Sequence, residues 1–517
     1  MRGMSGSQQD EIERTYDVEA GTVFPDLAGV DGVGIVGQPE ELDLEAVYFD
    51  TAGLDLARHG VTLRRRTGGH DAGWHLKLPR VGDTRTEVHE PLGDAGEQVP
   101  DALIAHIRAI VRDRPLQPVV RLATARREYA LHDAAGGVLA TVCDDQVRAE
   151  RLDGTGGPGS RDSVVQSWRE WELELDHGVE ALLNVLEEQL LAAGAAPAAS
   201  ASKLLRALGD LPPAEPPGSD HAPTGSARAL FSAHLAEHTA KLHRQDAAVR
   251  AGRPQGIHKL RIAGRRLRSA LATWRPQLDG AATEPVRDEL RWLGEQLAPA
   301  RDAQVLREHL AEVLSDQPAE LVVGSVAARI DDELGAAYLA GRDRAVEALD
   351  GDRYLRLLDA LDRLIESPPL TSGSEEAAEQ VVKGLLRRDA KRLRRAVRDI
   401  DAAGTPGERD VSFHEARKKA KRLRYAGEMA RPVLGKKARS LAASAKKVQE
   451  ALGVHQDSVV ARERLRELGM QAHLGGENAF TFGRLHGVEE ARAVGAEADF
   501  DRAWKRLRRK HLNHWLG

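Results

Sequence analysis

A basic pattern that occurs twice is the feature that most constrains this chain. The order His-x-x-Arg-x-x-x-[Arg/Lys]-Arg-Leu-Arg starts at His258 and again at His414, so the two copies lie 156 residues apart (414 − 258). One copy would describe an ordinary charged helix. Two copies at one offset indicate an internal duplication, so the C-terminal part of the chain is expected to fold as two related halves.

Each copy gathers its cations on one face of a helix. At 100° per residue, the histidine and the basic residues that follow it fall within an arc of about 80°, whereas the leucines face another side. No acids are interleaved on that face to relieve the repulsion. The face is therefore either solvated or a binding surface for a polyanion, and the repetition favours the polyanion. The two faces consist of His258, Arg261, Arg265 and Arg268, and of His414, Arg417, Lys421 and Arg424.

Bulk properties exclude several classes of protein. The formal net charge is −6 over 517 residues, so positive charge is segregated rather than dominant, and nucleic acid is not an expected partner. The single cysteine, Cys143, rules out an intramolecular disulfide and suits a reducing compartment. The sequence shows neither an apolar signal core nor a run of about 20 apolar residues. These features predict a cytoplasmic protein without a membrane segment, and they leave the oligomeric state open.

Changes in composition along the chain predict a multi-domain protein. Residues 8–208 read as strands with a few helices, and residues 209–226 form a Pro-rich linker. Residues 227–517 read as long helices with a second break near Ser367. This break separates two repeats, at about 227–366 and 375–517. The prediction is an all-α, duplicated helical bundle whose two basic faces line a shared groove.

The N-terminal strands alternate in a way that places charge on one face. Glu11 and Glu13 oppose apolar residues on one strand, and Glu172 and Glu174 do so on another. Other strands carry bases in the same pattern, at Arg64 with Arg66 and at His75 with Lys77, and one strand pairs a base with an acid, Arg85 with Glu87. A closed antiparallel barrel with a charged interior would explain the alternation. A sandwich with a charged solvent face would explain it as well.

Carboxylates on some strands and bases on others suit one kind of chemistry. Clustered carboxylates repel one another unless a cation holds them, and hard oxygen ligands suit Mg²⁺ or Mn²⁺. Arginine and lysine suit phosphate oxygens. Together they form a layout for metal-assisted attack on a polyphosphate chain. No Walker-type Gly-rich loop is present, so a P-loop enzyme is excluded.

These residues resemble those of a CYTH domain, the triphosphate tunnel metalloenzyme family. The matching pieces are Glu11-x-Glu13, Leu63 to Arg66, Trp74-x-x-Lys77, Arg85-x-Glu87, Asp144, Glu172-x-Glu174 and Ser202-Lys203-Leu204. The resemblance implies an eight-stranded antiparallel tunnel that hydrolyses triphosphate compounds with Mg²⁺ or Mn²⁺. It implies catalytic roles for Glu11, Glu13, Glu172 and Glu174; metal ligands at those four residues with Glu87 and Asp144; and substrate binding by Arg64, Arg66, Lys77, Arg85, Arg126 and Lys203, with Arg127 as the alternative to Arg126.

One departure from the family pattern concerns catalysis. The family's opening motif is Glu-x-Glu-x-Lys, and this chain has Thr15 at the lysine position. Arg14 is adjacent, but alternation points it to the opposite face. The alternative to an enzyme is therefore a non-catalytic polyphosphate-binding protein with a degenerate tunnel. Nucleotide cyclisation, known in some family members, is a third reading.

Residues from about 225 to 517 resemble a CHAD domain, a helical family often fused to CYTH domains. The match covers both basic repeats and the segments with Asp302 and Asp457. It implies binding of inorganic polyphosphate on the basic faces. An alternative role for the histidines is a structural bond to Asp302 or Asp457. The implied polyphosphate binders are His258, Arg261, Arg265, Arg266, Arg268, His414, Arg417, Lys421, Arg422 and Arg424.

Overall fold

The chain divides into two compact units in the computed structural model, Met1–Glu215 and Pro216–Gly517. The structure describes residues 7–80, 84–93, 98–152, 165–209, 225–253, 255–371 and 377–516. Most of the predicted linker and the end of the break after Ser367 therefore lie outside the described residues. Among the helices described, none is both long and apolar enough to cross a membrane.

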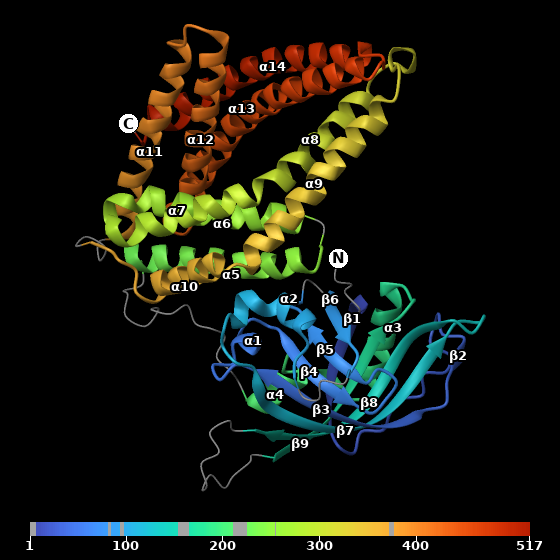
Figure 1. The fold of residues 1–517 in the computed structure, drawn as a ribbon. Coiled ribbons are helices and arrows are strands. Elements are labelled where there is room, and N and C mark those ends of the chain that lie inside the picture. Colours follow the sequence, from blue (N-terminus) through green and yellow to red (C-terminus); the bar gives the residue numbers. More distant parts are fainter. Residues whose placement is uncertain are drawn as a thin grey trace. The chain divides into compact units, whose positions relative to one another are not determined.

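The first unit is a closed, eight-stranded antiparallel barrel (Figure 1). The ring closes because β1 pairs with β6 along its first half and with β9 along its second half. Closure removes the free edges that a sandwich would leave, so the barrel alternative is confirmed. The order around the ring is β1 (Ser7–Val18), β6 (Thr84–Glu90), β5 (Gly73–Lys77), β4 (Thr62–Thr67), β3 (Glu40–Asp50), β7 (Gln117–His132), β8 (Val138–Arg151) and β9 (Val165–Leu175).

Short elements complete this unit. Strand β2 (Ile35–Val36) pairs with β7, and β10 (Ala196–Pro197) pairs with β1. Two helices, α1 (Asp55–Arg58) and α2 (Asp101–Val111), contact each other beside the barrel. The carboxylate of Asp50 starts α1, because it accepts hydrogen bonds from the backbone amides of Leu56 and Ala57 at 2.9 Å each.

Apolar packing outside the barrel leaves its interior for charged residues. Helix α3 (Glu180–Ala192) buries Leu183 and Leu186 against Trp171 and Leu173 of β9, all fully buried. Another helix, α4 (Lys203–Leu208), packs Leu204 on apolar residues of β3, β7 and β8. The N-cap Ser202, whose side chain accepts from Leu205 N, fixes the start of α4. This start positions the side chain of Lys203, the first residue of α4, in the charged part of the interior.

The second unit is helical and repeats at about the offset read from the sequence, although its first pair of helices, 227–250 and 378–401, lies 151 residues apart (378 − 227). Adding 156 to the bounds of α9 (Val326–Asp350) gives 482–506, against Phe480–Leu507 for α14. The remaining pairs are α5 (Ala227–Arg250) with α11 (Ala378–Asp401), α6 (Gly256–Trp274) with α12 (Pro406–Met429), and α7 (Gly280–Gln296) plus α8 (Ala298–Ser315) with α13 (Arg431–Leu474). Helix α10 (Asp352–Glu366) packs on α5, α7 and α9.

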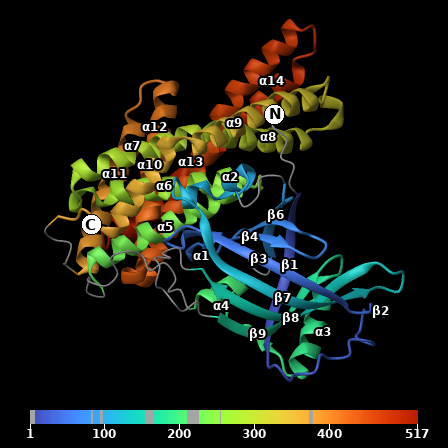
Figure 2. The same ribbon diagram turned by 60° about the horizontal axis from the view of Figure 1, so that its bottom comes forward.

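The starts of two helices in this unit are fixed by capping. A capping box begins α12, which carries the second basic pattern, with Thr405 accepting from Glu408 N and the Glu408 side chain accepting from Thr405 N. Ser226 caps α5, the helix before the first basic pattern, through Ala229 N. The far parts of the hairpins α8–α9 and α13–α14 share an apolar cluster. Figures 1 and 2 show the α8–α9 hairpin projecting from the α5–α6–α7 layer, whereas the α13–α14 hairpin extends from α12, on which α13 packs.

A reciprocal contact joins the two repeats where α6 packs on α12. Arg266 on α6 forms an ion pair with Glu428 on α12 at 2.6 Å. Its counterpart Arg422, 156 residues later, donates to the backbone oxygen of Ala272, which is the counterpart of Glu428. When residue i meets j and the copy of i meets the copy of j, the two halves are related by a pseudo-two-fold axis.

Asp389 of α11 holds the second half of this junction. The carboxylate is 1% exposed, accepts from Thr273 Oγ1 at 2.8 Å, and lies 2.9 Å from Arg422 Nε. Arg392 also donates to it, at 2.7 Å. One buried acid therefore ties α6, α11 and α12 together.

Replacing Asp389 with alanine should destabilise the helical unit. Removing one partner of a fully buried pair costs about 3–5 kcal/mol, and because Arg422 and Arg392 keep some solvent contact we expect about 2 kcal/mol. Asp399→Ala, on an exposed position of the same helix, should change stability by less than about 0.5 kcal/mol. Urea unfolding followed by far-UV circular dichroism measures both. Equal transition midpoints would contradict this account of the junction.

Candidate functional site

Carboxylates face one another across two neighbouring strands inside the barrel. Glu13 and Glu174 are register partners on β1 and β9, which brings like charges directly opposite. Burial raises the pKa of Glu174 to about 7, against the attraction of Lys77, and Glu13 and Glu172 add to the rise. Among the described residues, Glu174 has no hydrogen bond or ion pair. These positions match the prediction from alternation.

Lys77 of β5 neutralises the first group of carboxylates. Its Nζ lies 2.6 Å from a carboxylate oxygen of Glu11. The same atom lies 3.3 Å from Glu13 and 3.3 Å from Glu87. Burial and a hydrogen bond to Glu87 raise the pKa of Glu11 to about 8. At Glu87 the charge of Lys77 outweighs the effect of burial and, with a hydrogen bond from His75, lowers the pKa. Glu11 and Glu87 therefore share one proton, which resides on Glu11.

Lys203 neutralises a second group, two members of which the sequence prediction missed. Its Nζ lies 2.9 Å from Asp145 and 2.6 Å from both Glu170 and Glu172. Ligand oxygens of these three acids lie within 4.8 Å of one another. Arg126 grips Asp145 with two hydrogen bonds, at 2.8 and 2.7 Å, and donates to Glu172 at 2.6 Å. This placement settles the choice of inward arginine, because Arg127 is exposed and pairs with Glu41.

Asp144 was expected in the acidic set and does not lie there. Its carboxylate accepts two hydrogen bonds from Arg169, at 2.7 Å each, and one from Trp171 Nε1 at 3.2 Å. Strand alternation then points Asp145 to the interior, where it is fully buried. Asp145 replaces Asp144 as the β8 member of the interior set.

Arginines crowd on the side of the interior formed by β4 and β7. The pKa of Arg66 is lowered by burial and by the nearby charges of Arg64 and Arg126. Nε atoms of Arg64 and Arg66 are buried and make no hydrogen bond within the described part of the chain. Arg85 of β6 donates to the backbone oxygens of Leu78 and Gly60, at 3.1 and 3.4 Å. Unpaired guanidinium donors are the groups that phosphate oxygens satisfy.

The interior is already filled by these ion pairs. The open space among Glu13, Tyr48, Arg64 and Lys203 is about 50 Å³, which holds only a few water molecules. An anion larger than a few water molecules would enter this space only if the internal pairs parted, so that its oxygens replaced the carboxylates on the cations.

Thr15 lies on the interior face, beside Glu172 in register. Arg14 points outward, where it pairs with Glu187 at 2.5 Å, so it does not substitute for the absent motif lysine. Lys77 and Lys203 supply the ammonium groups of the interior from other elements.

The oxygen donors of the interior fit a hard divalent cation. Glu13 and Glu174 oppose each other, and a cation between like charges removes their repulsion. The charge of Glu172 adds to the raised pKa of Glu174, and the charges of Glu87 and Glu174 add to the raised pKa of Glu11. Glu13 and Glu174 are the residues that would hold such an ion, with Glu172 nearby. When bound, a divalent cation supplies charge neutralisation and an activated water.

In the helical unit, the two basic faces meet at the pseudo-two-fold axis. Burial and, in decreasing order, the charges of Arg265, Arg417 and Arg261 together lower the pKa of Lys421 to about 7. Arg265 Nε donates to the Tyr425 hydroxyl across the junction at 3.1 Å. The four cations Arg261, Arg265, Arg417 and Lys421, here called the basic seam, therefore converge from both repeats.

Acids and histidines flank the basic seam. Asp302 pairs with Arg261 at 2.7 Å, and Asp457 lies 3.8 Å from Arg417. His414 bonds Gln456 through Nδ1 at 2.7 Å, so the expected alternative of a histidine–aspartate bond is not what the structure shows at this position. Burial and neighbouring cations lower the pKa of His414, and they do the same at His258.

The other predicted binders are placed differently from the seam. Arg266 and Arg424 both pair with Glu428, at 2.6 and 2.7 Å, and Arg422 is held by Asp389. These three have carboxylate partners at the junction between the repeats. Arg268 lies near Arg265 and Arg291, whose charges add to the effect of burial in lowering its pKa.

A closed tunnel with acids and bases facing each other, followed by a duplicated helical unit with a basic seam, defines a two-domain protein with clustered cations in both parts. Family models match in the same order: "CYTH domain" at residues 9–207 and "CHAD domain" at residues 233–466. The chain belongs to the family of proteins that join a CYTH domain to a CHAD domain. These domains bind triphosphate-type and polyphosphate ligands.

Relatives extend over the whole chain. An uncharacterized protein of Mycobacterium tuberculosis, Rv2226, is 40% identical over 503 residues and covers 96% of each chain. Among solved structures, PptA from Streptomyces chartreusis is 22% identical, with a TM-score of 0.46 and coverage of 54% of this chain and 99% of its own. The CHAD domain from the plant Ricinus communis is 28% identical, with a TM-score of 0.44 and coverage of 55% and 92%.

Binding of a polyanion to the basic seam should take up a proton near neutral pH. The pKa of Lys421 is about 7 in the free protein, and an anion beside it favours the ammonium form. Affinity should therefore be constant well below pH 7 and fall as pH rises above 7, because the proton must then be taken from solvent. Calorimetry with polyphosphate in buffers of different ionisation enthalpy measures the uptake.

Lys421→Arg provides the matched control, because it keeps the charge at every pH used. The variant should bind without the proton uptake. Identical uptake in wild type and variant would assign the proton to another group and contradict this account of Lys421.

Proposed function

We propose that the tunnel hydrolyses triphosphate compounds with Mg²⁺ or Mn²⁺ and that the helical unit binds polyphosphate. The observation that carries the first part is the division of the interior into two sets of opposite charge. Carboxylates line β1 and β9, while Arg64, Arg66 and Arg126 line β4 and β7. Acids for a metal beside bases for phosphate is the arrangement that phosphoryl transfer to water needs.

The roles of individual residues follow from their surroundings. The Nε donors of Arg64 and Arg66 make no hydrogen bond to a described residue and would orient the phosphate chain, although the guanidinium of Arg66 also pairs with Asp71. Glu13 and Glu174 would hold the cation. Glu172 is kept ionised because Lys203 and Arg126 outweigh the effect of burial and lower its pKa, so it would accept a hydrogen bond from the attacking water. Lys77 and Lys203 would turn from carboxylates to phosphate oxygens when the chain enters.

Glu13→Gln should lower phosphate release from tripolyphosphate by at least about 100-fold. The substitution keeps the shape of the side chain and removes the charge that opposes Glu174. Glu45→Gln, an exposed position on β3, is the control and should behave like wild type. The full-length protein is assayed with Mn²⁺ and with Mg²⁺. Equal turnover in Glu13→Gln and wild type would overturn the catalytic assignment.

A second candidate function is a tunnel that binds polyphosphate without turnover. Thr15 favours it, because the lysine of the family motif is missing at a position that faces the interior. In that case the wild-type chain would bind tripolyphosphate and release no phosphate, and Thr15→Lys would restore release. Robust wild-type turnover, abolished by Glu13→Gln, would remove this candidate.

Polyphosphate binding by the helical unit rests on the convergence of the basic seam. A linear polyanion that neutralises these cations releases its own counterions, so affinity should fall steeply with salt, as it does for nucleic acids. Arg261 and Arg417 are related by the pseudo-two-fold axis and should contribute alike.

Arg261→Gln and Arg417→Gln should each weaken binding of long-chain polyphosphate and reduce the salt slope by about 0.7 for each phosphate group that is no longer neutralised. Arg466→Gln, an exposed position toward the end of α13, should leave affinity and slope unchanged. Titrations at several salt concentrations provide both quantities. A double variant that binds as tightly as wild type would show that the seam is not the binding surface.

A further inference from the structure

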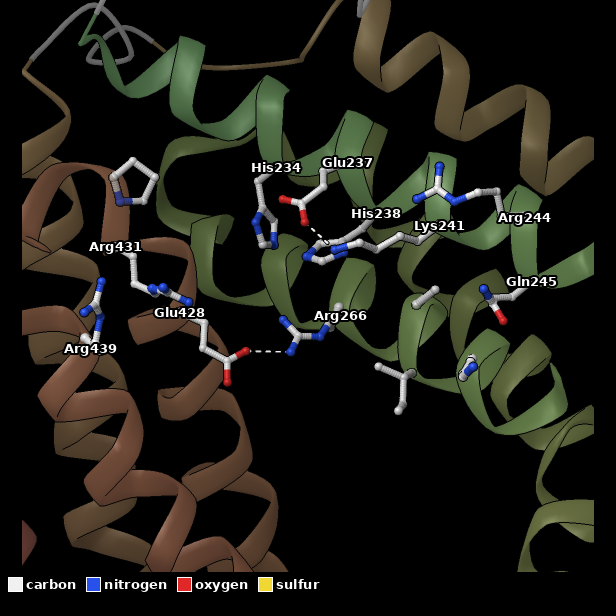
Figure 3. Close-up of a pocket in the computed structure, with 14 residues that line it drawn as sticks. His234, Glu237, His238, Lys241, Arg244, Gln245, Arg266, Glu428, Arg431 and Arg439 are labelled. Atoms are coloured by element: carbon white, nitrogen blue, oxygen red, sulfur yellow. Dashed lines mark hydrogen bonds and ion pairs between the residues drawn. The ribbon is translucent and has the colours of Figure 1, made fainter. Parts of the chain in front are cut away.

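A second basic region lies on α5, α6 and the α12–α13 corner, and it contains two histidines. The pocket has a volume of about 930 Å³. Its cations are Lys241, Arg244, Lys259, Arg266, Arg431 and Arg439. Figure 3 shows His234, Glu237 and His238 directed from one helix into this pocket, above the Arg266–Glu428 ion pair.

The spacing on α5 brings the three side chains together. Residues three and four apart share a face of a helix, which places His234 beside both Glu237 and His238. One ligand atom of each residue lies within 4.8 Å of those of the other two. The two imidazole rings are 4.3 Å apart between centroids, in an edge-to-face arrangement.

His238 carries a buried nitrogen that the protein does not satisfy. Its side chain is 2% exposed. Its Nδ1 makes no hydrogen bond to any described residue. A buried polar atom without a partner costs free energy and is rare in folded proteins, so this nitrogen calls for a ligand.

We propose that His234, Glu237 and His238 form a transition-metal site whose remaining coordination position opens into the basic pocket. Two imidazoles and one carboxylate are a ligand set that Zn²⁺ takes in proteins, with a further position left for an exogenous ligand. Nitrogen donors select such an ion over Mg²⁺, which prefers oxygen. The site is separate from the tunnel and does not depend on the proposed hydrolysis.

Both histidines are in the form that binds metal. Burial lowers the pKa of His234 to about 3, with the charge of His238 adding to it, and burial lowers the pKa of His238 to about 4. Metal binding requires the neutral ring, and at neutral pH no proton has to leave either histidine.

The cations facing the site set its affinity. Lys241 pairs with Glu237 one turn along α5, and both side chains are exposed, at 43% and 56%. An exposed pair of this type contributes little to stability, so a metal ion can displace the ammonium. Arg266 lies on the opposite wall, and its charge opposes a lone cation. An anionic oxygen at the open coordination position would offset that repulsion, and phosphate has the matching chemistry.

The test uses full-length, tag-free protein stripped of metal and titrated with Co²⁺ as a probe for Zn²⁺. Excess Mg²⁺ keeps the oxygen ligands of the tunnel occupied. We expect one equivalent of Co²⁺ with intense visible absorption, as nitrogen ligation at low coordination number gives, and its displacement by Zn²⁺. His234→Ala and His238→Ala should each weaken binding by at least about 100-fold, more than loss of an outer-shell group does.

Two further variants protect the test from effects on folding. Glu237→Gln changes an exposed side chain and should weaken binding by at least about 10-fold. Lys241→Met removes the competing ammonium and should strengthen binding by about 2-fold or more, which a purely structural role for the cluster does not predict. His486→Ala on α14 is the control and should retain wild-type binding.

Wild-type absorption no greater than that of the His234→Ala/His238→Ala double variant would overturn the proposal, as would unchanged Co²⁺ affinity in Glu237→Gln and Lys241→Met together. Loss of tripolyphosphate hydrolysis in Glu13→Gln with the Co²⁺ spectrum intact would leave this site standing. Failure of the metal site and failure of the proposed hydrolysis are therefore distinguishable.

Discussion

Charge of one sign at buried positions is the constraint on which both units depend. In the barrel, Glu13 and Glu174 face each other across two strands, and in the helical unit Lys421 lies among three arginines. Like charges repel strongly where water is scarce, so each cluster needs an opposite charge nearby. The barrel provides its own, in Lys77 and Lys203. The basic seam is supplied less fully, because Asp302 and Asp457 pair with arginines at its edges.

The two sites therefore differ in how a ligand would change their charge balance. Under the proposed function, substrate and metal would exchange with ion pairs that already exist in the tunnel, so binding would rearrange the interior without a large change in net charge. In the helical unit, an incoming polyanion would add compensation that is lacking in the free protein. Ion pairs exchanged inside a protein gain little net free energy, because desolvation offsets attraction. Addition of missing counter-charge is the stronger source of affinity.

Most of the fold and part of the candidate site could be predicted from the sequence. Strict alternation placed Glu11, Glu13, Arg64 and Lys77 on one face of their strands, the family resemblance implied that this face lines a barrel, and the 156-residue offset predicted the helical repeat. The resemblance chose Asp144 where the structure has Asp145, and alternation could not correct the choice, because both faces of β8 are buried there. Glu170 could have been predicted, because it lies two residues before Glu172 and so shares a strand face with Glu172 and Glu174.

Other features depend on packing and left weaker signals. The partners of Arg266 and Arg422 come from the crossing of α6 and α12, which no local pattern describes. The pairing of Lys203 with three acids depends on where α4 meets the barrel. By contrast, the cluster on α5 had a readable signal, two histidines four residues apart with a glutamate at the third, although a surface helix without a ligand would show the same spacing.

The pseudo-two-fold axis has a consequence for the direction of a bound chain. A seam in which Arg261 corresponds to Arg417 and Arg265 to Lys421 offers nearly the same contacts to a polymer laid along it from either end. A nucleic acid strand has two different ends and reads differently when reversed. A linear phosphate chain is unchanged by reversal, so under the proposed function the two halves of the seam would meet equivalent phosphate oxygens. The duplication would then give the receptor the same two-fold symmetry as a ligand without polarity.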